Sequence, residues 1–407
     1  MNRQRRNEIE NVADLQKQLD SRTDLGKFVV QGVDLTGVSG LEQANFRGCI
    51  LIGCRFKDID QEQILGKQGA SIFPHFDDLP YEPYRKSLYS VAELMKNVSG
   101  AGYTGTRDFA IYAHSHRARH HPGGISIREA LAQRIHDHAI DDALAEFLED
   151  NESKGVIGIM GGHGTLRSDP VFEKVASLAW KLTRAGYLVI TGGGPGVMEA
   201  ANMGAWFAGH DDRATLASAI SELSVADTFN GGHAEGSPAF LGAVREYIDS
   251  AGKVIEKYSA AGRQPAVSMA VPTWFYGHEP SNLFSSAVAK YFDNSIREEG
   301  LLAIARAGVI YAPGSAGTMQ EIFQDLTQNH YATYASRSPM VLFGSQRYQA
   351  EYRLIDDFIK AKGMSETYGD MVTLLDDVDQ IVDFIGRHPV RCVPRPKPLY
   401  EQVDLDQ

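Results

Sequence analysis

The sequence predicts an α/β protein with a Rossmann-like, doubly wound parallel sheet that follows an N-terminal accessory region. From residue 154 onward, short apolar runs alternate with helical stretches, three of these runs end in glycine-rich turns, and the first 150 residues lack this alternation. Alternating strands and helices are typical of a parallel sheet that helices cover on both faces. We therefore expect an accessory region over 1–150, a Rossmann-like domain over 151–390 and a C-terminal tail over 391–407.

Composition and charge exclude several classes of protein. The 407 residues include 40 Lys and Arg against 52 Asp and Glu, which gives a net charge of −12. Such a surface repels DNA, RNA and anionic lipid, so we expect no nucleic-acid partner. Three cysteines fit a reducing compartment rather than a disulfide scaffold. The N-terminus does not resemble a signal peptide, and no apolar run reaches about 18 residues, so we expect no membrane partner and a cytoplasmic location.

The accessory region shows a five-residue rhythm over 33–58, in which Phe46, Leu51 and Phe56 take matching places. This rhythm resembles the pentapeptide repeat, a stacked β-coil whose central apolar side chains point inward. The alternative is an ordinary β-hairpin with accidental spacing. The polar residues 1–25 are expected to form a solvated helix or arm.

The end of the accessory region is rich in Gly, His and Arg over 99–125. We expect an exposed loop there, followed by an amphipathic helix over 126–150. Arginines interleave with the histidines of this loop and no cysteine accompanies them, so we expect no metal site. These histidines are His114, His116, His120 and His121.

The alternation of apolar runs and helical stretches places the elements of the Rossmann-like domain. Strands are expected at 155–160, 187–191, 266–271, 308–311, 339–343 and 371–375. Helices are expected at 170–185, 197–208, 240–260 and 283–300, in a stretch that ends near 329, and after each of the last two strands. In such sheets, ligands bind beyond the carboxyl ends of the strands.

Glycine-rich turns follow three of the expected strands, at 161–164, 192–196 and 313–317. Glycine lets the backbone approach a ligand closely, and the helix N-terminus that follows offers unpaired N–H groups and a partial positive charge. A turn of this kind binds phosphate or another anion. We therefore expect a phosphate-bearing ligand at this edge of the sheet.

Two common phosphate-binding patterns are absent. No G-x-x-x-x-G-K-[ST] sequence occurs, which excludes an ordinary P-loop nucleotide triphosphatase. The dinucleotide pattern G-x-G-x-x-G also fails after the first strand, and glycines stand where NAD-binding proteins carry a ribose-binding acid. A mononucleotide or a sugar phosphate is the remaining class of ligand.

Two segments resemble elements of the LOG family of nucleoside 5′-monophosphate phosphoribohydrolases. Residues 192–202 (GGGPGVMEAAN) are similar to its GGGxxGxM element, and residues 313–321 (PGSAGTMQE) are similar to its PGGxGTxxE element. The accessory region and the turn at 161–163 are similar to the longer purine/pyrimidine nucleotide monophosphate nucleosidases of the same superfamily. LOG proteins are often labelled lysine decarboxylases. This chain has no His-Lys dipeptide of the kind that many PLP decarboxylases use, so we do not expect decarboxylation.

The resemblance implies a set of functional residues. Glu321 closes the second element and corresponds to the catalytic carboxylate, and Arg297, in a helix upstream, corresponds to its partner. Related proteins form dimers or larger assemblies, which implies a homo-oligomer, and the implied reaction needs no metal or redox cofactor. The substrate-binding residues expected from the glycine turns and the resemblance are Gly161, Gly162, Gly193, Gly194, Gly196, Glu199, Gly314, Ser315, Ala316, Gly317 and Thr318.

Structural interpretations stand beside these roles. Thr318 to Glu321 has the form of a capping box, in which the carboxylate satisfies a backbone amide. Glu199 fits either an acid at a helix start or a contact to ribose, and Arg297 fits a surface charge as well as a site residue. The aromatic residues 274–276 fit either base stacking or core packing.

The expected activity is hydrolysis of the N-glycosidic bond of a nucleoside 5′-monophosphate, AMP or a cytokinin-type ribotide, to free base and ribose 5-phosphate. Positive charge builds on the ribose ring during such a cleavage, and a carboxylate beside C1′ stabilises it and activates water. We expect the helix N-terminus to keep Glu321 ionised. The alternatives are a non-hydrolytic nucleotide sensor and a transferase that passes the ribosyl phosphate to an acceptor other than water.

Overall fold

The computed structural model describes residues 7–22, 24–73, 75–210, 212–259, 264–276 and 279–394. The chain divides into two compact units. The first comprises Met1–Leu88 and His114–Asp150, and the second comprises Tyr89–Ala113 and Asn151–Gln407. Residues 89–113, which we expected in the accessory region, therefore pack with the Rossmann-like unit. Among the described helices, none is both long and apolar enough to cross a membrane.

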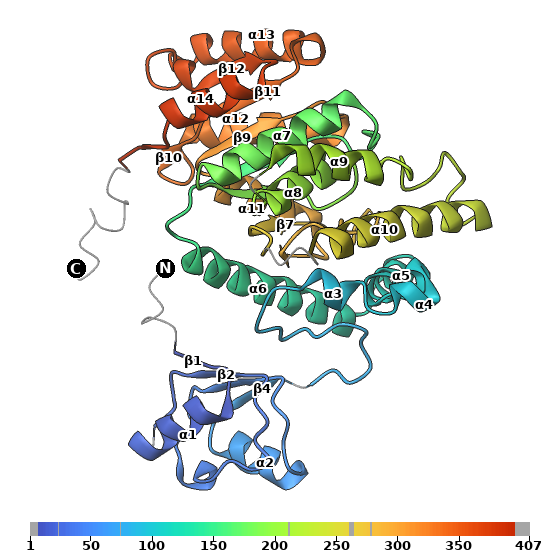
Figure 1. Ribbon diagram of the computed structural model, residues 1–407. Helices are drawn as coiled ribbons and strands as arrows, with labels where there is room; N and C mark the ends of the chain where they lie inside the picture. Colours follow the sequence, from blue (N-terminus) through green and yellow to red (C-terminus); the bar gives the residue numbers. More distant parts are fainter. Residues whose placement is uncertain are drawn as a thin grey trace. The chain divides into compact units, whose positions relative to one another are not determined.

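A seven-stranded sheet forms the centre of the second unit, and all of its strands run parallel. Helices lie on both faces of this sheet, so the Rossmann-like, doubly wound fold is confirmed (Figure 1). The strand order is β12-β11-β9-β5-β6-β7-β8. The strands are β5 (Val156–Met160), β6 (Leu188–Thr191), β7 (Ser268–Ala270), β8 (Ala287–Val288), β9 (Gly308–Tyr311), β11 (Met340–Phe343) and β12 (Val372–Leu375).

The direction of winding reverses between β5 and β9. From β5 the chain adds β6, β7 and β8 on one side, and it then returns to place β9, β11 and β12 on the other. In open α/β sheets, this switch point is where the loops at the carboxyl ends diverge and leave room for a ligand. The turns that follow β5 and β9 are two of the glycine-rich turns predicted from the sequence.

Aspartate side chains begin several helices of this unit, because an N-cap carboxylate accepts a hydrogen bond from an amide in the first turn. Asp169, Asp212, Asp293 and Asp377 each do so. The helices are α7 (Pro170–Arg184), α8 (Val197–Phe207), α9 (Arg213–Leu223), α10 (Pro238–Ser259), α11 (Asn294–Ile304), α12 (Ala316–Tyr331), α13 (Ser345–Ala361) and α14 (Val378–Arg387).

Two departures from the expected elements lie in this unit. The expected helix over 283–300 is wrong in its first half, because β8 lies there and α11 begins only after its cap, Asp293. The tail is also partly structured, since β13 (Arg391–Cys392) pairs with β10 (Ser336–Arg337) in an antiparallel ladder. The part of the tail beyond residue 394 lies outside the described residues.

The loop expected over 99–125 is largely helical instead. Helices α3 (Val91–Leu94) and α4 (Val98–Ala101) lead into α5 (Arg107–Arg119). Within the second unit, Asp108 accepts hydrogen bonds from Nζ of Lys290 at 2.8 and 3.0 Å and from Nε1 of Trp274 at 2.8 Å. All three side chains are almost fully buried, so this polar cluster anchors the segment in the core.

The chain just before α3 covers an edge of the large sheet. Tyr89 forms an antiparallel bridge with Val288 of the edge strand β8. Each residue donates its amide to the carbonyl of the other, at 3.0 and 2.9 Å. The backbone groups at this end of β8 are thereby paired.

The first unit contains a stacked coil of four parallel strands, β1 (Glu8–Ile9), β2 (Val29–Gln31), β3 (Ile50–Ile52) and β4 (Ser71–Phe73). Val29 pairs with Ile50, and Ile50 pairs with Ser71, so each turn of the coil takes 21 residues. Parallel pairing shows that the hairpin alternative is wrong. Phe46 and Leu51 lie in the apolar core of the coil, while Phe56 packs against it half-buried.

Among the described residues, helices α1, α2 and α6 lie wholly within the first unit. Helix α1 (Val12–Ser21) lies within the polar stretch for which we expected a helix or arm. Helix α2 (Ile59–Lys67) lies between the third and fourth strands of the coil. Helix α6 (Ile127–Asp150) covers the stretch over which the periodicity predicted an amphipathic helix.

Candidate active site

A cavity of about 470 Å³ lies where the turns after β5, β6 and β9 meet. Its volume falls within the range of about 300–1,000 Å³ that is typical of small-molecule sites. Ten of the residues predicted from the sequence line it. These are Gly161, Gly162, Gly193, Gly194, Arg297, Ser315, Ala316, Gly317, Thr318 and Glu321.

The turn after β9 carries the backbone donors of the cavity. Helix α12 begins at Ala316, and its N-cap residue Ser315 makes no side-chain hydrogen bond to the first turn. The first amides of a helix have no partner within it, so those of Ala316 and Gly317 are available to an anion. The amide of Gly162 donates to the carbonyl of Pro313 at 3.0 Å, which ties this turn to the one after β5.

The turn after β6 shapes a wall of the cavity and does not supply donors in the way we expected. The amide of Gly193 donates to Oγ1 of Thr191 at 3.0 Å, and the amide of Gly194 faces Sδ of Met198 at 3.4 Å. Gly196 has a φ of +68°, and a Cβ there would lie 2.5 Å from the carbonyl oxygen of Gly162. Glycine at 196 therefore allows the two turns to pack together.

Three predicted positions lie outside the cavity lining, namely Gly196, Gly314 and Glu199. Gly314 packs directly against Thr318, whose hydroxyl would collide with any Cβ at 314. Glu199 is only 1% exposed and does not bind a ligand. Its carboxylate accepts from Nε of Arg167 at 2.8 Å and also from Tyr247, so the expected ribose contact is wrong. A buried, paired acid of this kind holds α8 in place.

Arg297 and Glu321 face each other across the cavity, with Nη1 lying 3.9 Å from Oε1. Each side chain is about one tenth exposed, 11% for the arginine and 12% for the glutamate, so the surface-charge interpretation of Arg297 is wrong. Nε of Arg297 donates to the carbonyl of Val271 at 2.7 Å, which fixes the orientation of the guanidinium. Residues from α11, α12 and the end of β7 thus meet at one point.

The pKa of Glu321 is raised to about 7, because burial and the nearby carboxylate of Glu298 raise it more than Arg297 lowers it. This differs from our expectation that the helix N-terminus keeps Glu321 ionised. Glu321 stands in the second turn of α12, whose cap is Ser315, so the capping-box interpretation of Thr318 is wrong as well. At neutral pH this carboxyl exchanges its proton readily, which suits an acid–base role.

Several lining residues were not assigned a role from the sequence. Lys290 lies in the cavity wall, and its ammonium donates to Ser281 at 3.0 Å as well as to Asp108. Its position after the short strand β8 was hidden by the helix expected there. Glu298 follows Arg297 directly and also lines the cavity. Among the described residues, no cluster of three or more His, Cys, Asp or Glu side chains could hold a metal ion.

The aromatic residues after β7 divide between the two roles that we considered. Trp274 is fully buried and belongs to the core. Tyr276 is 62% exposed and lines the cavity, and its hydroxyl accepts from Nδ2 of Asn294 at 3.1 Å. Of the three, Tyr276 is therefore the side chain that the cavity offers for stacking.

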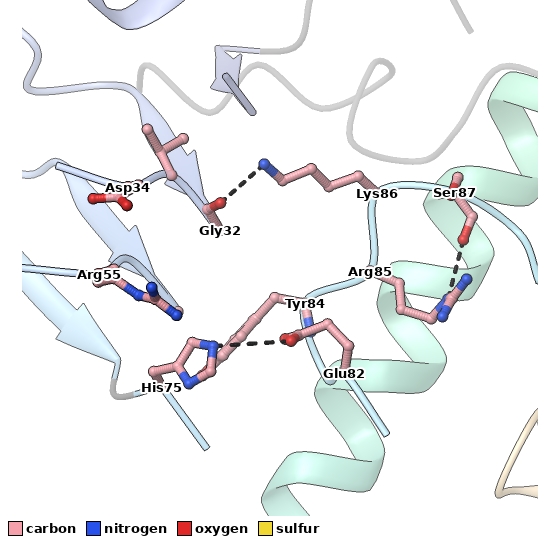
Figure 2. Close-up of a pocket in the computed structure, with 11 residues that line it drawn as sticks. Gly32, Asp34, Arg55, His75, Glu82, Tyr84, Arg85, Lys86 and Ser87 are labelled. Atoms are coloured by element: carbon pink, nitrogen blue, oxygen red, sulfur yellow. Dashed lines mark hydrogen bonds and ion pairs between the residues drawn. The ribbon is translucent and has the colours of Figure 1, made fainter. Parts of the chain in front are cut away.

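A second cavity of about 390 Å³ lies in the first unit and is lined by basic side chains (Figure 2). Nζ of Lys86 donates to the carbonyl of Gly32 at 2.9 Å, and Nε of Arg85 donates to the carbonyl of Ser87 at 3.1 Å. Figure 2 shows both cations turned toward backbone oxygens. The contact of Lys86 joins the coil to the chain that leaves it, and the contact of Arg85 stays within that chain, so both cations have a structural role.

Two family models match the Rossmann-like unit. A model described as possible lysine decarboxylase matches residues 254–385, and a model of the SLOG cluster4 family matches residues 154–210. This part of the chain is therefore similar to both families. This similarity indicates a nucleotide-related function, and the residues that line the cavity lie within the matched ranges.

Solved structures with a similar fold include two that bind or carry the molybdenum cofactor. The molybdenum cofactor binding protein of Rippkaea orientalis is 14% identical, with a TM-score of 0.32, over 57% of this chain and 96% of that one. The Moco carrier protein of Chlamydomonas reinhardtii is 16% identical, with a TM-score of 0.33, over 57% of this chain and 96% of that one. No curated protein matches the chain.

Proposed function

We propose that this protein hydrolyses the N-glycosidic bond of a nucleoside 5′-monophosphate, with AMP or a cytokinin-type ribotide as the favoured substrate. The observation that carries the proposal is the pair of Arg297 and Glu321, which face each other in a cavity at the switch point of a LOG-like sheet. The products are the free base and ribose 5-phosphate.

The phosphate takes the position in front of α12. Ala316 and Gly317 line the cavity in the first turn of that helix, where amides have no partner within the helix, and the partial positive charge of the helix N-terminus attracts an anion. Binding through the phosphate holds the ribose at a constant distance from Glu321, one turn further along the helix. Such positioning removes much of the entropic cost of the reaction.

Glu321 acts on the anomeric carbon in its ionised form. The oxygen of a water forms a bond to C1′, the C1′–N bond breaks with its electron pair on the base, and the proton of the water passes to Glu321. Transfer of that proton to the departing nitrogen gives the free base and returns Glu321 to its ionised form. The carboxylate also stabilises the positive charge that spreads over the ribose ring in the transition state. General base action of this kind contributes roughly 10²–10⁴-fold to the rate.

Arg297 positions and tunes this carboxylate. Its hydrogen bond to the carbonyl of Val271 orients the guanidinium, and its charge opposes the rise in the pKa of Glu321 that burial and Glu298 cause. Without that charge, the carboxyl would hold its proton at neutral pH and could not accept one from water.

Lysine decarboxylation, which the description of one matching model suggests, has no support in the cavity. Lys290 is the lysine among the lining residues, and its ammonium is held by both oxygens of Asp108 and by Ser281. A lysine bound in this way is not available to form a Schiff base.

The test is chromatography of AMP, GMP, CMP, UMP and isopentenyl-AMP after incubation with the purified protein. We expect free base from the wild type, none from Glu321→Gln, and wild-type release from Glu299→Gln, an exposed neighbour on α11. Tight nucleotide binding without release of base would instead support the sensor. Release only when an acceptor other than water is added would support the transferase. Light scattering tests the homo-oligomer that the resemblance implies.

A further inference from the structure

The wall of the cavity next to Arg297 carries a second buried carboxylate, that of Glu298. The side chain is 6% exposed and lines the cavity. It stands beside the Arg297 and Glu321 pair and belongs to the same helix as the arginine. The mechanism proposed above gives it no direct contact with substrate.

One oxygen of Glu298 is already engaged. Nδ2 of Asn294 donates to Oε2 at 3.0 Å, and the same amide nitrogen donates to the hydroxyl of Tyr276 at 3.1 Å. Asn294 therefore holds the tyrosine and the carboxylate together as one polar wall. Its amide nitrogen must face both acceptors, which defines the orientation of the amide group.

The other oxygen of Glu298 has no hydrogen-bond partner among the described residues, although it is buried. A buried carboxylate oxygen that has lost its hydration is costly unless it receives a hydrogen bond. The ligand that fills the cavity is the group placed to supply the missing donor. That ligand must therefore carry an N–H or O–H at this wall.

We propose that Glu298 accepts a hydrogen bond from the vicinal hydroxyls of the substrate's ribose, with Tyr276 beside it, and so selects ribonucleotides over deoxyribonucleotides. This inference rests on the proposed function. With the phosphate in front of α12 and C1′ beside Glu321, the ribose diol is the part of the substrate that carries donors between them. A carboxylate that is buried and half-satisfied rejects an analogue without the hydroxyl, because its oxygen would then stay unpaired.

The test is equilibrium binding in a protein that cannot turn the ligand over. In a Glu321→Gln background, calorimetry compares AMP with 2′-deoxy-AMP and 3′-deoxy-AMP. We expect AMP to bind about tenfold to a hundredfold more tightly than at least one deoxy analogue, the range for a hydrogen bond to a charged group. Adding Glu298→Gln should reduce that preference to less than about twofold.

The substitution Glu298→Gln tests the carboxylate specifically, because it removes the charge and keeps the shape of the side chain. Its amide oxygen must accept from Asn294, so its NH₂ group faces the ligand. A hydroxyl can accept from that group, but this bond is neutral and therefore weaker than the charge-assisted bond to the carboxylate. Glu299→Gln, the exposed residue next along α11, is the matched control and should keep the preference for AMP. The melting temperature of each variant shows that the fold is retained.

The outcomes separate this inference from the proposed function. Equal binding of the three nucleotides to the Glu321→Gln protein, or an unchanged preference after Glu298→Gln, would overturn the role of Glu298 alone. Failure of every nucleotide to bind, together with the absence of base release by the wild type, would overturn the proposed function and this inference with it.

Discussion

The guanidinium of Arg297 occupies the space in which a side chain at Gly192 would stand. A Cβ built on Gly192 overlaps with Nη2 of Arg297 and lies 2.8 Å from Sδ of Met198. The backbone of Gly192 does not have a positive φ, so its conformation would accept alanine. Only the neighbouring side chains forbid a larger residue there.

Gly192→Ala should therefore displace Arg297 while leaving the fold intact. Because a displacement of about 1 Å in an active site costs up to about 10²-fold in rate, we expect kcat/KM for base release to fall between about tenfold and a hundredfold. Steady-state kinetics with AMP measures the change. Gly164→Ala is the control, since a Cβ at 164 meets no atom within 4 Å. Equal activity of both variants and the wild type would contradict this role of Gly192.

The pH dependence of base release should follow the ionisation of Glu321. Burial raises the pKa of this carboxyl to about 7 and Arg297 lowers it, so kcat/KM in the wild type should rise with pH through about 7. Arg297→Ala removes the lowering charge, and the midpoint should move to higher pH by about one unit or more. Carbon-13 NMR of labelled glutamate carboxyls follows the same ionisation without turnover. A midpoint that does not move in the variant would show that Arg297 does not tune Glu321.

The stability of the second unit should fall as pH rises toward neutrality. Burial raises the pKa of Asp325 from 3.8 to about 7, whereas in the unfolded chain this carboxyl loses its proton near the ordinary value. Between these two values the folded state binds the extra proton, so its stabilisation is complete at low pH and is lost as pH rises through about 7.

Asp325→Asn should remove this dependence. We expect the fall in the free energy of unfolding between about pH 5 and about pH 8 to be smaller by about 2–3 kcal/mol than in the wild type. The asparagine still pairs with its two partners, because the hydroxyl of Tyr311 can accept as well as donate. Urea unfolding at the two pH values measures the difference. An equal fall in both proteins would place the pH dependence elsewhere.

The buried ion pair of Asp108 and Lys290 should matter more for stability than an ion pair near the surface. Asp108→Ala leaves a buried ammonium without its partner, which typically costs about 3–5 kcal/mol. The second substitution Lys290→Met removes that charge and should restore part of the loss. The half-exposed pair of Glu93 and Arg107 is the comparison, and Glu93→Ala should cost at most about 1 kcal/mol. Chemical denaturation measures all of these. Similar losses for Asp108→Ala and Glu93→Ala would contradict the anchoring role of Asp108.

The sheet and the central pair of the site could be predicted from the sequence because their signals are local. Six of the seven strands of the large sheet are short apolar runs bounded by turns, whereas the two-residue strand β8 was hidden in an expected helix. The glycine turns stand at strand ends that meet at the switch point. Arg297 and Glu321 were found through the similarity of one motif and its spacing. Residues that depend on side-chain partners far away in the sequence were not found.

Glu199, Asp108 and Glu298 illustrate that limit. Glu199 has a structural role because it pairs with Arg167, 32 positions earlier, and Asp108 has one because it pairs with Lys290, 182 positions later. The hydrophobic periodicity of the sequence does not indicate pairs that lie so far apart in the chain. The segment 99–125 looked like a loop because polar and glycine residues dominate it, although tertiary contacts make most of it helical. Glu298 was passed over because nothing in the sequence shows which face of α11 points into a cavity.

The bridge between Tyr89 and Val288 has a consequence for any shortened form of this protein. Removing everything before residue 151 would keep the cavity and the matched residues. It would also expose the edge of the large sheet at β8. An unpaired edge strand can pair with a strand of another molecule, which promotes aggregation. The same truncation would remove Asp108, the counter-ion of the buried Lys290. A soluble short form must therefore retain the chain from before Tyr89, including the stretch that returns through the first unit.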